Sequence, residues 1–169
     1  MRLFGLTSHR RRGAAIVLGT LCVIAIPASS ASAAPTTVHL YAKTTRNTFT
    51  DPSGRPILGH VPPPPTGSVL TNTGAEYLGT FSHHADVLSA STNVICFVTN
   101  APHALCYGQV AIGGSMLLAN RFAANLSHSD PFATIPITGG TGKLAGAHGT
   151  IHTTLVGRNG VNLSITYST

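Results

Sequence analysis

The sequence feature that most constrains the fold is a glycine-rich stretch between two apolar segments, residues 135–151. Five of the chain's eighteen glycines fall within it. They are Gly139, Gly140, Gly142, Gly146 and Gly149. Glycine is favoured where the backbone takes a positive φ or passes close to another segment. The pattern therefore predicts one compact, fixed connection between two β-strands, with these glycines as its structural turn.

Two phosphate-binding motifs do not fit these glycines. A P-loop continues from Gly-Lys into Ser or Thr, whereas Lys143 is followed by Leu144. A Rossmann fingerprint needs a crossover helix after the glycines. Residues 150–167 instead alternate as a β-hairpin around Arg158-Asn159-Gly160, where Asn-Gly is a strong hairpin signal. A nucleotide-binding loop is therefore not expected.

The first 33 residues have the composition of a secretory signal peptide. Arginines at position 2 and at 10–12 precede an apolar run, 14–26, and Ala31-Ser32-Ala33 is a small-x-small cleavage site. The apolar run is too short to span a membrane, so we expect no stable membrane insertion. Cleavage lowers the net charge from +6 to +2. The remaining basic residues are scattered, so no nucleic-acid partner is expected, and the protein is predicted to be secreted and extracellular.

Two cysteines remain after cleavage, Cys96 and Cys106. An even pair in an oxidising compartment predicts a disulfide. The turn residues Asn100-Ala101-Pro102 lie between them, so the two cysteines should face each other across a hairpin. The alternative, a redox or metal pair, lacks the usual C-x-x-C spacing.

Residues 34–169 are long enough for a single domain, and their alternating apolar positions predict eight strands and no helix. The strands are expected at residues 37–49, 75–88, 92–99, 104–112, 115–123, 132–138, 150–156 and 161–167. Residues 51–73 include four consecutive prolines, which exclude a helix or an inner strand. We expect a Pro-rich loop there, either a functional lid or an ordinary surface loop. Strand pattern alone leaves a sandwich and a closed barrel open.

The glycine stretch resembles a family signature. ITGGTGKLAGAHG, residues 137–149, is similar to the I-T-G-G-T-G-x-[YFL]-x-G-A-x-G pattern of the allene oxide cyclase and dirigent-type β-barrels, in the version common in small secreted actinobacterial proteins. AKTTRNTFTD and YLGTFSHHADV are similar to the first two strand blocks of that branch. The resemblance implies an all-β fold, an eight-stranded antiparallel up-and-down β-barrel with no exposed sheet edge. It also implies a homodimer or homotrimer.

A barrel of eight strands is either filled by its side chains or holds one small ligand. The resemblance implies a function of the cavity, since plant cyclases use a carboxylate to guide an unstable epoxide and dirigents orient the coupling of phenoxy radicals. The first-strand acidic position of those families falls near Ala42-Lys43, which holds no carboxylate. The sequence therefore does not predict cyclisation through a carboxylate at that position.

Five side chains are predicted to line the cavity and bind a ligand: Tyr41, Lys43, Tyr107, Arg121 and His152. Arg121 lies in an apolar run, where a guanidinium needs either solvent or an acceptor such as a ligand carboxylate or phenol. The alternative is an outward arginine. His83 and His84 point to opposite faces of a strand, so neither a metal site nor another cofactor is expected. No G-x-S-x-G nucleophile elbow occurs.

Three functions remain open. The leading hypothesis is a secreted β-barrel that binds a small hydrophobic or phenolic molecule, as a carrier or a stereochemical template. The second is an isomerase or cyclase of the allene oxide cyclase type, in which Lys43, Tyr41, Arg121 or His152 would supply acid–base and electrostatic groups. The third is a structural or surface-interaction protein with a filled barrel. The sequence leaves open whether the protein is an enzyme and which residues would be catalytic.

Overall fold

The computed structural model describes residues 34–58, 64–127, 130–157 and 160–169. The expected signal peptide, residues 1–33, lies outside the described residues. So do positions 59–63 of the Pro-rich loop, and Arg158 and Asn159 of the expected hairpin turn.

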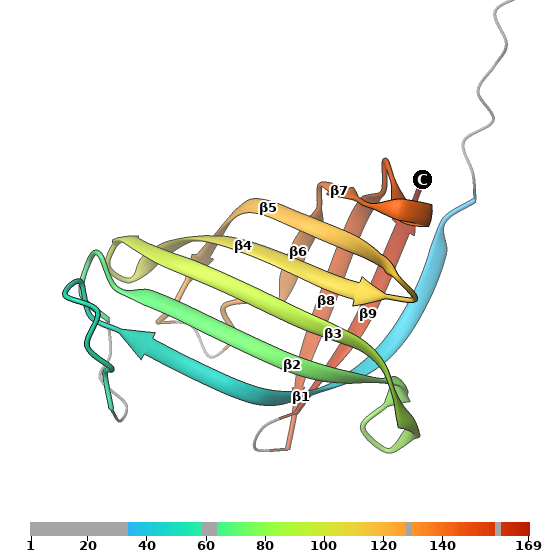
Figure 1. Cartoon of the computed structure of the whole chain (residues 1–169), viewed down its shortest axis with the longest axis horizontal. Coiled ribbons are helices and arrows are strands. Elements are labelled where there is room, and N and C mark those ends of the chain that lie inside the picture. Colours follow the sequence, from blue (N-terminus) through green and yellow to red (C-terminus); the bar gives the residue numbers. More distant parts are fainter. Residues whose placement is uncertain (1–33, 59–63, 128–129, 158–159) are drawn as a thin grey trace, which may run out of the picture. The chain divides into compact units, whose positions relative to one another are not determined.

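The described chain consists of strands and one short 3-10 helix (Figure 1). In chain order they are β1 (Thr36–Thr50), β2 (Val69–Thr80), β3 (His83–Asn100), β4 (His103–Ile112), β5 (Ser115–Asn125), β6 (Thr134–Ile137), β7 (Gly139–Gly140), the 3-10 helix η1 (Gly142–Leu144), β8 (His148–Val156) and β9 (Gly160–Ser168). Every strand pairing is antiparallel.

The strands form one sheet in the order β6-β8-β9-β1-β2-β3-β4-β5-β7. β9 returns to pair with β1, so β2 to β5 curve around one side and β8 and β9 lie behind them (Figure 1). The expected antiparallel up-and-down barrel is confirmed. The described residues form nine strands instead of the expected eight because the extended stretch 134–140 changes partners at Thr138, from β8 to β5. The Thr138 amide donates to the carbonyl oxygen of Leu118 at 2.8 Å, which carries the pairing across this seam.

The second predicted strand was placed wrongly. Residues 75–88 form the end of β2, a turn at positions 81–82 and the start of β3. β2 begins at Val69, inside the stretch expected to be a loop, so the Pro-rich connection ends at Ser68. Gly79 has a φ of +112° and lies at a register shift between β2 and β3, which marks a β-bulge. The turn itself contains no glycine or proline, which is why the sequence did not reveal it.

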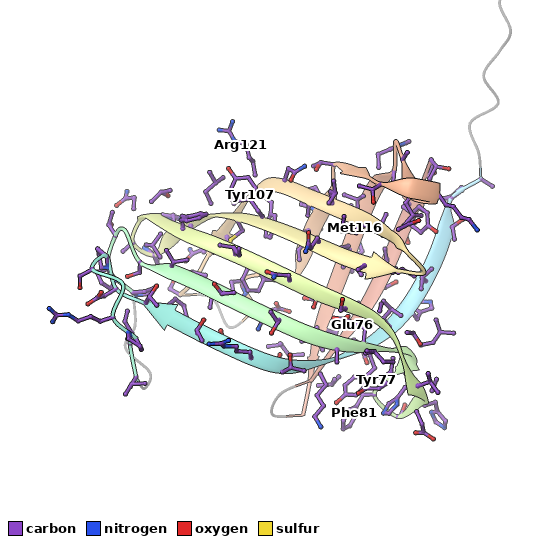
Figure 2. The ribbon with its side chains drawn as sticks, viewed as in Figure 1. Glu76, Tyr77, Phe81, Tyr107, Met116 and Arg121 are labelled. Carbon is purple, nitrogen blue, oxygen red and sulfur yellow. A yellow bond between two sulfur atoms is a disulfide. The ribbon has the colours of Figure 1, made fainter. Side chains whose placement is uncertain are left out.

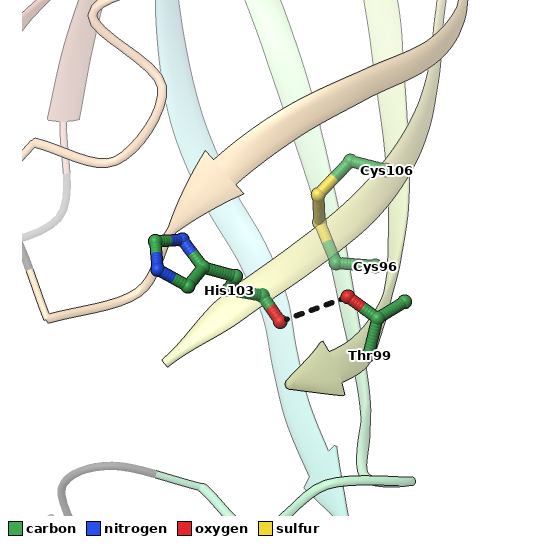
Figure 3. The surroundings of a disulfide bond; sticks show 4 residues. All are labelled: Cys96, Thr99, His103 and Cys106. Atoms are coloured by element: carbon green, nitrogen blue, oxygen red, sulfur yellow. Dashed lines mark hydrogen bonds between the residues drawn. A yellow bond between two sulfur atoms is a disulfide. The ribbon is translucent and has the colours of Figure 1, made fainter. Parts of the chain in front are cut away.

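The disulfide between Cys96 and Cys106 is present, as predicted. The two residues are directly opposite each other on β3 and β4, with a Cα–Cα distance of 4.0 Å, and both are fully buried. Near the end of the same hairpin, the hydroxyl of Thr99 donates to the carbonyl oxygen of His103 at 3.4 Å (Figure 3). The covalent link therefore joins the neighbouring strands β3 and β4 inside the core.

Two positions of the glycine stretch require the absence of a side chain. A Cβ on Gly140 would lie 2.1 Å from the carbonyl oxygen of Leu144, and one on Gly149 would lie 2.0 Å from that of Thr166. Both contacts are with backbone atoms, which have little freedom to move. The connection from β7 through η1 to β8 is therefore fixed by close backbone packing. No helix in the described part of the chain is long and apolar enough to cross a membrane.

Candidate ligand cavity

The barrel encloses a cavity of about 280 Å³. Its walls come from every strand except β7 and from the segment that connects β5 to β6. Most lining side chains are apolar and include Val94, Val110, Leu117, Ile135, Ile151 and Leu163. Hydroxyl, amide or carboxylate groups are presented by Thr44, Asn72, Gln109, Thr92, Asp130 and Thr153. The cavity thus combines an apolar wall with a few polar groups, as small-molecule sites do.

Beside this cavity lies a buried carboxyl group, that of Glu76 on β2 (Figure 2). Its side chain is fully shielded from solvent. The hydroxyl of Thr92, which lines the cavity, donates to Glu76 Oε1 at 2.5 Å. The second oxygen, Oε2, has no hydrogen-bond partner. Glu76 is therefore linked to the cavity by its hydrogen bond with Thr92.

Small neighbouring residues make room for this side chain. In the sheet register Glu76 lies opposite Ala42 on β1 and Ala90 on β3. A Cβ on Gly74 would lie 2.7 Å from the Thr92 hydroxyl and 2.8 Å from Glu76 Oε1. Any larger residue at position 74 would press on the hydrogen-bonded pair.

Burial raises the pKa of Glu76 from its ordinary value of 4.5 to about 7. The cause is desolvation, which disfavours the charged carboxylate, and the hydrogen bond from Thr92 opposes it in part. A carboxyl group with such a pKa exists in both protonation states near neutral pH.

A second carboxylate, that of Asp130, lines the cavity from the segment between β5 and β6. It accepts hydrogen bonds from the backbone amide of Phe132 at 3.3 Å and from the hydroxyl of Thr153 at 3.4 Å. These contacts tie the segment to β8. Unlike Glu76, Asp130 is partly exposed.

The five predicted ligand residues do not line this cavity. Lys43 and His152 are exposed on the outer face of the sheet, and His152 Nδ1 is 3.2 Å from the hydroxyl of Thr134. Tyr41 packs outside the barrel with the rings of Phe81 and His84, at centroid distances of 5.5 and 4.8 Å. Figure 2 shows Phe81 outside the ribbon beside the β2–β3 turn. Their expected place in the barrel interior was wrong because on β1 and β8 the apolar residues, among them Leu40, Ala42 and Ile151, take the inner face.

Arg121 also lies outside, for a more specific reason. Two residues of β5, Asn120 and Arg121, oppose the single residue Tyr107 of β4, because the register shifts there. Arg121 has a φ of +56° and marks this β-bulge. The bulge turns Arg121 outward, where Figure 2 shows it projecting from the barrel, and Tyr107 opposite it is 38% exposed. Arg121 was expected inside because regular alternation from the buried Ala119 puts every second residue on the inner face. The extra residue of the bulge breaks that alternation.

Sequence reasoning missed Glu76 and Thr92. The first strand indeed has no carboxylate facing the cavity, but the next strand supplies one directly opposite Ala42. A signal was present, since Asn72, Gly74 and Glu76 alternate along one face, and Glu76 is the only glutamate in the chain. The alternation is hard to recognise because Asn72 lies in the stretch 51–73 that the prolines predict to be a loop. In the described residues, no three His, Cys, Asp or Glu side chains gather as metal ligands would.

No family model and no curated protein matches this chain. Among solved structures, a pterocarpan synthase dirigent protein matches with a TM-score of 0.55 and 18% identity, covering 80% of this chain and 84% of that chain. A pyocyanin demethylase matches with a TM-score of 0.49 and 19% identity, covering 78% and 99%. At this identity the first likeness establishes the fold alone, which is that of a dirigent-like barrel.

Proposed function

We propose that this protein is a secreted barrel that binds a small hydrophobic or phenolic molecule in its cavity, as a carrier or a stereochemical template. The single observation that carries the proposal is the apolar cavity of about 280 Å³ with its polar Thr92–Glu76 pair. A cavity of roughly 150 Å³ already admits benzene. The volume here suits one aromatic ring with a short substituent.

Two further observations support the proposal. The dirigent protein with the similar fold is a pterocarpan synthase, and its likeness to this barrel is the reason to consider phenolic ligands first. Secretion is supported by the buried disulfide between Cys96 and Cys106, since disulfides persist mainly in oxidising compartments. The leader-like composition of residues 1–33 agrees with it.

The test is a substitution that fills the cavity with a larger side chain, followed by a measurement of ligand affinity. Gly108 lines the cavity, and a Cβ there would make only ordinary contacts of 3.6 Å or more. Gly108→Leu should therefore leave the fold intact and weaken binding of 4-ethylphenol at least about tenfold, measured by calorimetry. The matched control, Ser91→Leu, adds the same side chain on the exposed face of β3 and should not change the affinity. Equal affinity in the wild type and Gly108→Leu would refute the cavity as the binding site.

One observation favours a second function, an isomerase or cyclase of the allene oxide cyclase type. The pKa of Glu76 is raised to about 7, near the value at which a general acid or base works best at neutral pH. In that function Glu76 would exchange a proton with a bound molecule through the hydroxyl of Thr92. Turnover of a bound ligand that is abolished in Glu76→Gln, with the affinity retained, would establish it.

A homodimer or homotrimer is part of the proposal. The outer face of β3 exposes Phe97 and Ile95, with exposed fractions of 47% and 37%. Phe97 forms an edge contact with Tyr107 of β4, which is also exposed. Neighbouring exposed apolar side chains often mark a contact between proteins. Sedimentation velocity should give a dimer or trimer that Phe97→Ser weakens, and a wild-type monomer at all concentrations would rule it out.

A further inference from the structure

One of the polar groups that a ligand meets in the cavity is the hydroxyl of Thr92. Thr92 lines the cavity, and its Oγ1 is 2.5 Å from Glu76 Oε1. A hydroxyl has one hydrogen to donate and two lone pairs that accept. The position of the proton in this short contact determines whether the Thr92 hydroxyl can donate or only accept a hydrogen bond toward the cavity.

When Glu76 is ionised, its carboxylate can only accept, so the Thr92 hydroxyl donates to it. The remaining lone pairs of Thr92 then face the cavity as acceptors. When Glu76 is protonated, its carboxyl proton belongs on Oε1, because Oε2 has no partner to receive a hydrogen bond and a buried donor without an acceptor is costly. Glu76 then donates to Thr92, which frees the threonine hydrogen for the cavity.

We propose that the Thr92–Glu76 pair is a proton-controlled specificity switch, which accepts a hydrogen bond from ligand hydroxyl groups when Glu76 is ionised and donates one to ligand carbonyl groups when Glu76 is neutral. The inference rests on the proposed function, because it assigns the class of ligand that the same cavity takes. Phenols, which both donate and accept, would bind in both states. Ketones and quinones, which only accept, would bind in the neutral state.

The other titratable groups of the described barrel form no hydrogen bond with Thr92, so Glu76 is the group that controls the switch. On the packed strands the charged or titratable side chains point outward, and on β1 and β3 they are His39, Tyr41, Lys43, Arg46, His83, His84 and Asp86. On β2 itself, Tyr77 lies against the rings of Tyr41 and His84 outside the barrel. Asp130 is the other carboxylate of the cavity, and its contacts are with Phe132 and Thr153. The raised pKa of Glu76 places its change of charge close to neutral pH.

The test compares three ligands of the same size at about pH 5.5 and about pH 8.5, on either side of the Glu76 transition. The probes are 4-ethylphenol, which donates and accepts, acetophenone, which only accepts, and propylbenzene, which does neither. Affinities are measured by calorimetry on the purified, disulfide-bonded protein. The affinity of acetophenone relative to 4-ethylphenol should fall roughly fivefold at the higher pH, the factor that one net hydrogen bond is worth. The affinity of propylbenzene should not change.

Variants separate the switch from other causes. Glu76→Gln should bind all three probes with a ratio that no longer depends on pH, because the amide does not titrate. Thr92→Val should lose the discrimination, and Thr92→Ser, which keeps the hydroxyl, should retain it. Circular dichroism checks that Thr92→Val is folded, and Glu76→Gln carries the test if it is not. Asp130→Asn is the control for the second carboxylate and should leave the switch in place.

The outcomes distinguish the two proposals. If the probes bind with a ratio that does not change with pH, or if the change persists in Glu76→Gln or disappears in Asp130→Asn, the switch is refuted and the binding function stands. If none of the three probes binds, including propylbenzene, the cavity function itself fails and the switch fails with it.

Discussion

Replacing Glu76 by glutamine should change how the stability of the barrel depends on pH. The fully buried carboxyl group has its pKa raised from 4.5 to about 7, so the folded protein holds a proton that the unfolded chain releases in this range. Unfolding therefore becomes easier as the pH rises from about 4.5 to about 7. Glutamine has nearly the same shape and does not titrate, so it lacks this dependence.

The size of the effect follows from the pKa difference. Each unit corresponds to about 1.4 kcal/mol, so the shift of Glu76 is worth at most about 3 kcal/mol. The contribution is fully present below pH 4.5 and is lost above pH 7. With a urea m-value of about 2 kcal/mol/M, the unfolding midpoint of the wild type should fall by roughly 1.5 M relative to Glu76→Gln.

The assay is urea unfolding of both proteins at closely spaced pH values between about 4 and about 8.5. Subtracting one stability curve from the other removes the contribution of the histidines, which the two proteins share. Ser91→Ala, an exposed substitution on β3 without a titrating group, is the control for the subtraction. A flat difference between the wild type and Glu76→Gln would show that Glu76 titrates as a solvated carboxyl group and would refute the reasoning.

Three further predictions concern the framework of the barrel. Gly140→Ala should destabilise the protein by at least about 2 kcal/mol because its Cβ would meet the Leu144 carbonyl, whereas Gly139→Ala, which has open space, should cost far less in the same urea unfolding experiment. Replacing Cys96 and Cys106 together by alanine should cost about 2 to 3 kcal/mol of unfolding free energy, because the disulfide closes a loop with a sequence separation of 10; an unchanged melting temperature would contradict this. Arg121→Gly should stabilise the folded protein by about 1 kcal/mol, because φ is +56° at this position and glycine adopts it without strain. Thermal unfolding measures the change, and a loss of stability would mean that outer-face contacts of the arginine outweigh the backbone strain.

The fold could be predicted from the sequence because its signals are local. Alternation of apolar residues marked most strands, and the glycine stretch carried the resemblance to a barrel family. The cavity residues could not be predicted in the same way, since they depend on the register between strands. Glu76 enters the core only because Ala42 and Ala90 face it across two neighbouring strands. Arg121 leaves it because of one extra residue in β5.

The choice of inner face was the other source of error. Polar residues of β1 such as Lys43 were expected inside because a ligand site needs polar groups. In the barrel, the apolar face of β1 with Leu40 and Ala42 is buried, as the hydrophobic effect requires of most strands. The Thr92–Glu76 pair lies on the inner side where Gly74, Ala42 and Ala90 leave space for it.

The change of partners at Thr138 has a consequence for how copies of this chain behave toward one another. The sheet is closed there by the two residue pairs of β7 with β5 and by the hydrogen bonds of Thr138. If this seam opened, β5 would present unpaired amide and carbonyl groups along its edge, and such an edge is a template for strands of other molecules. The backbone contacts around Gly140 therefore protect the protein against aggregation as well as against unfolding.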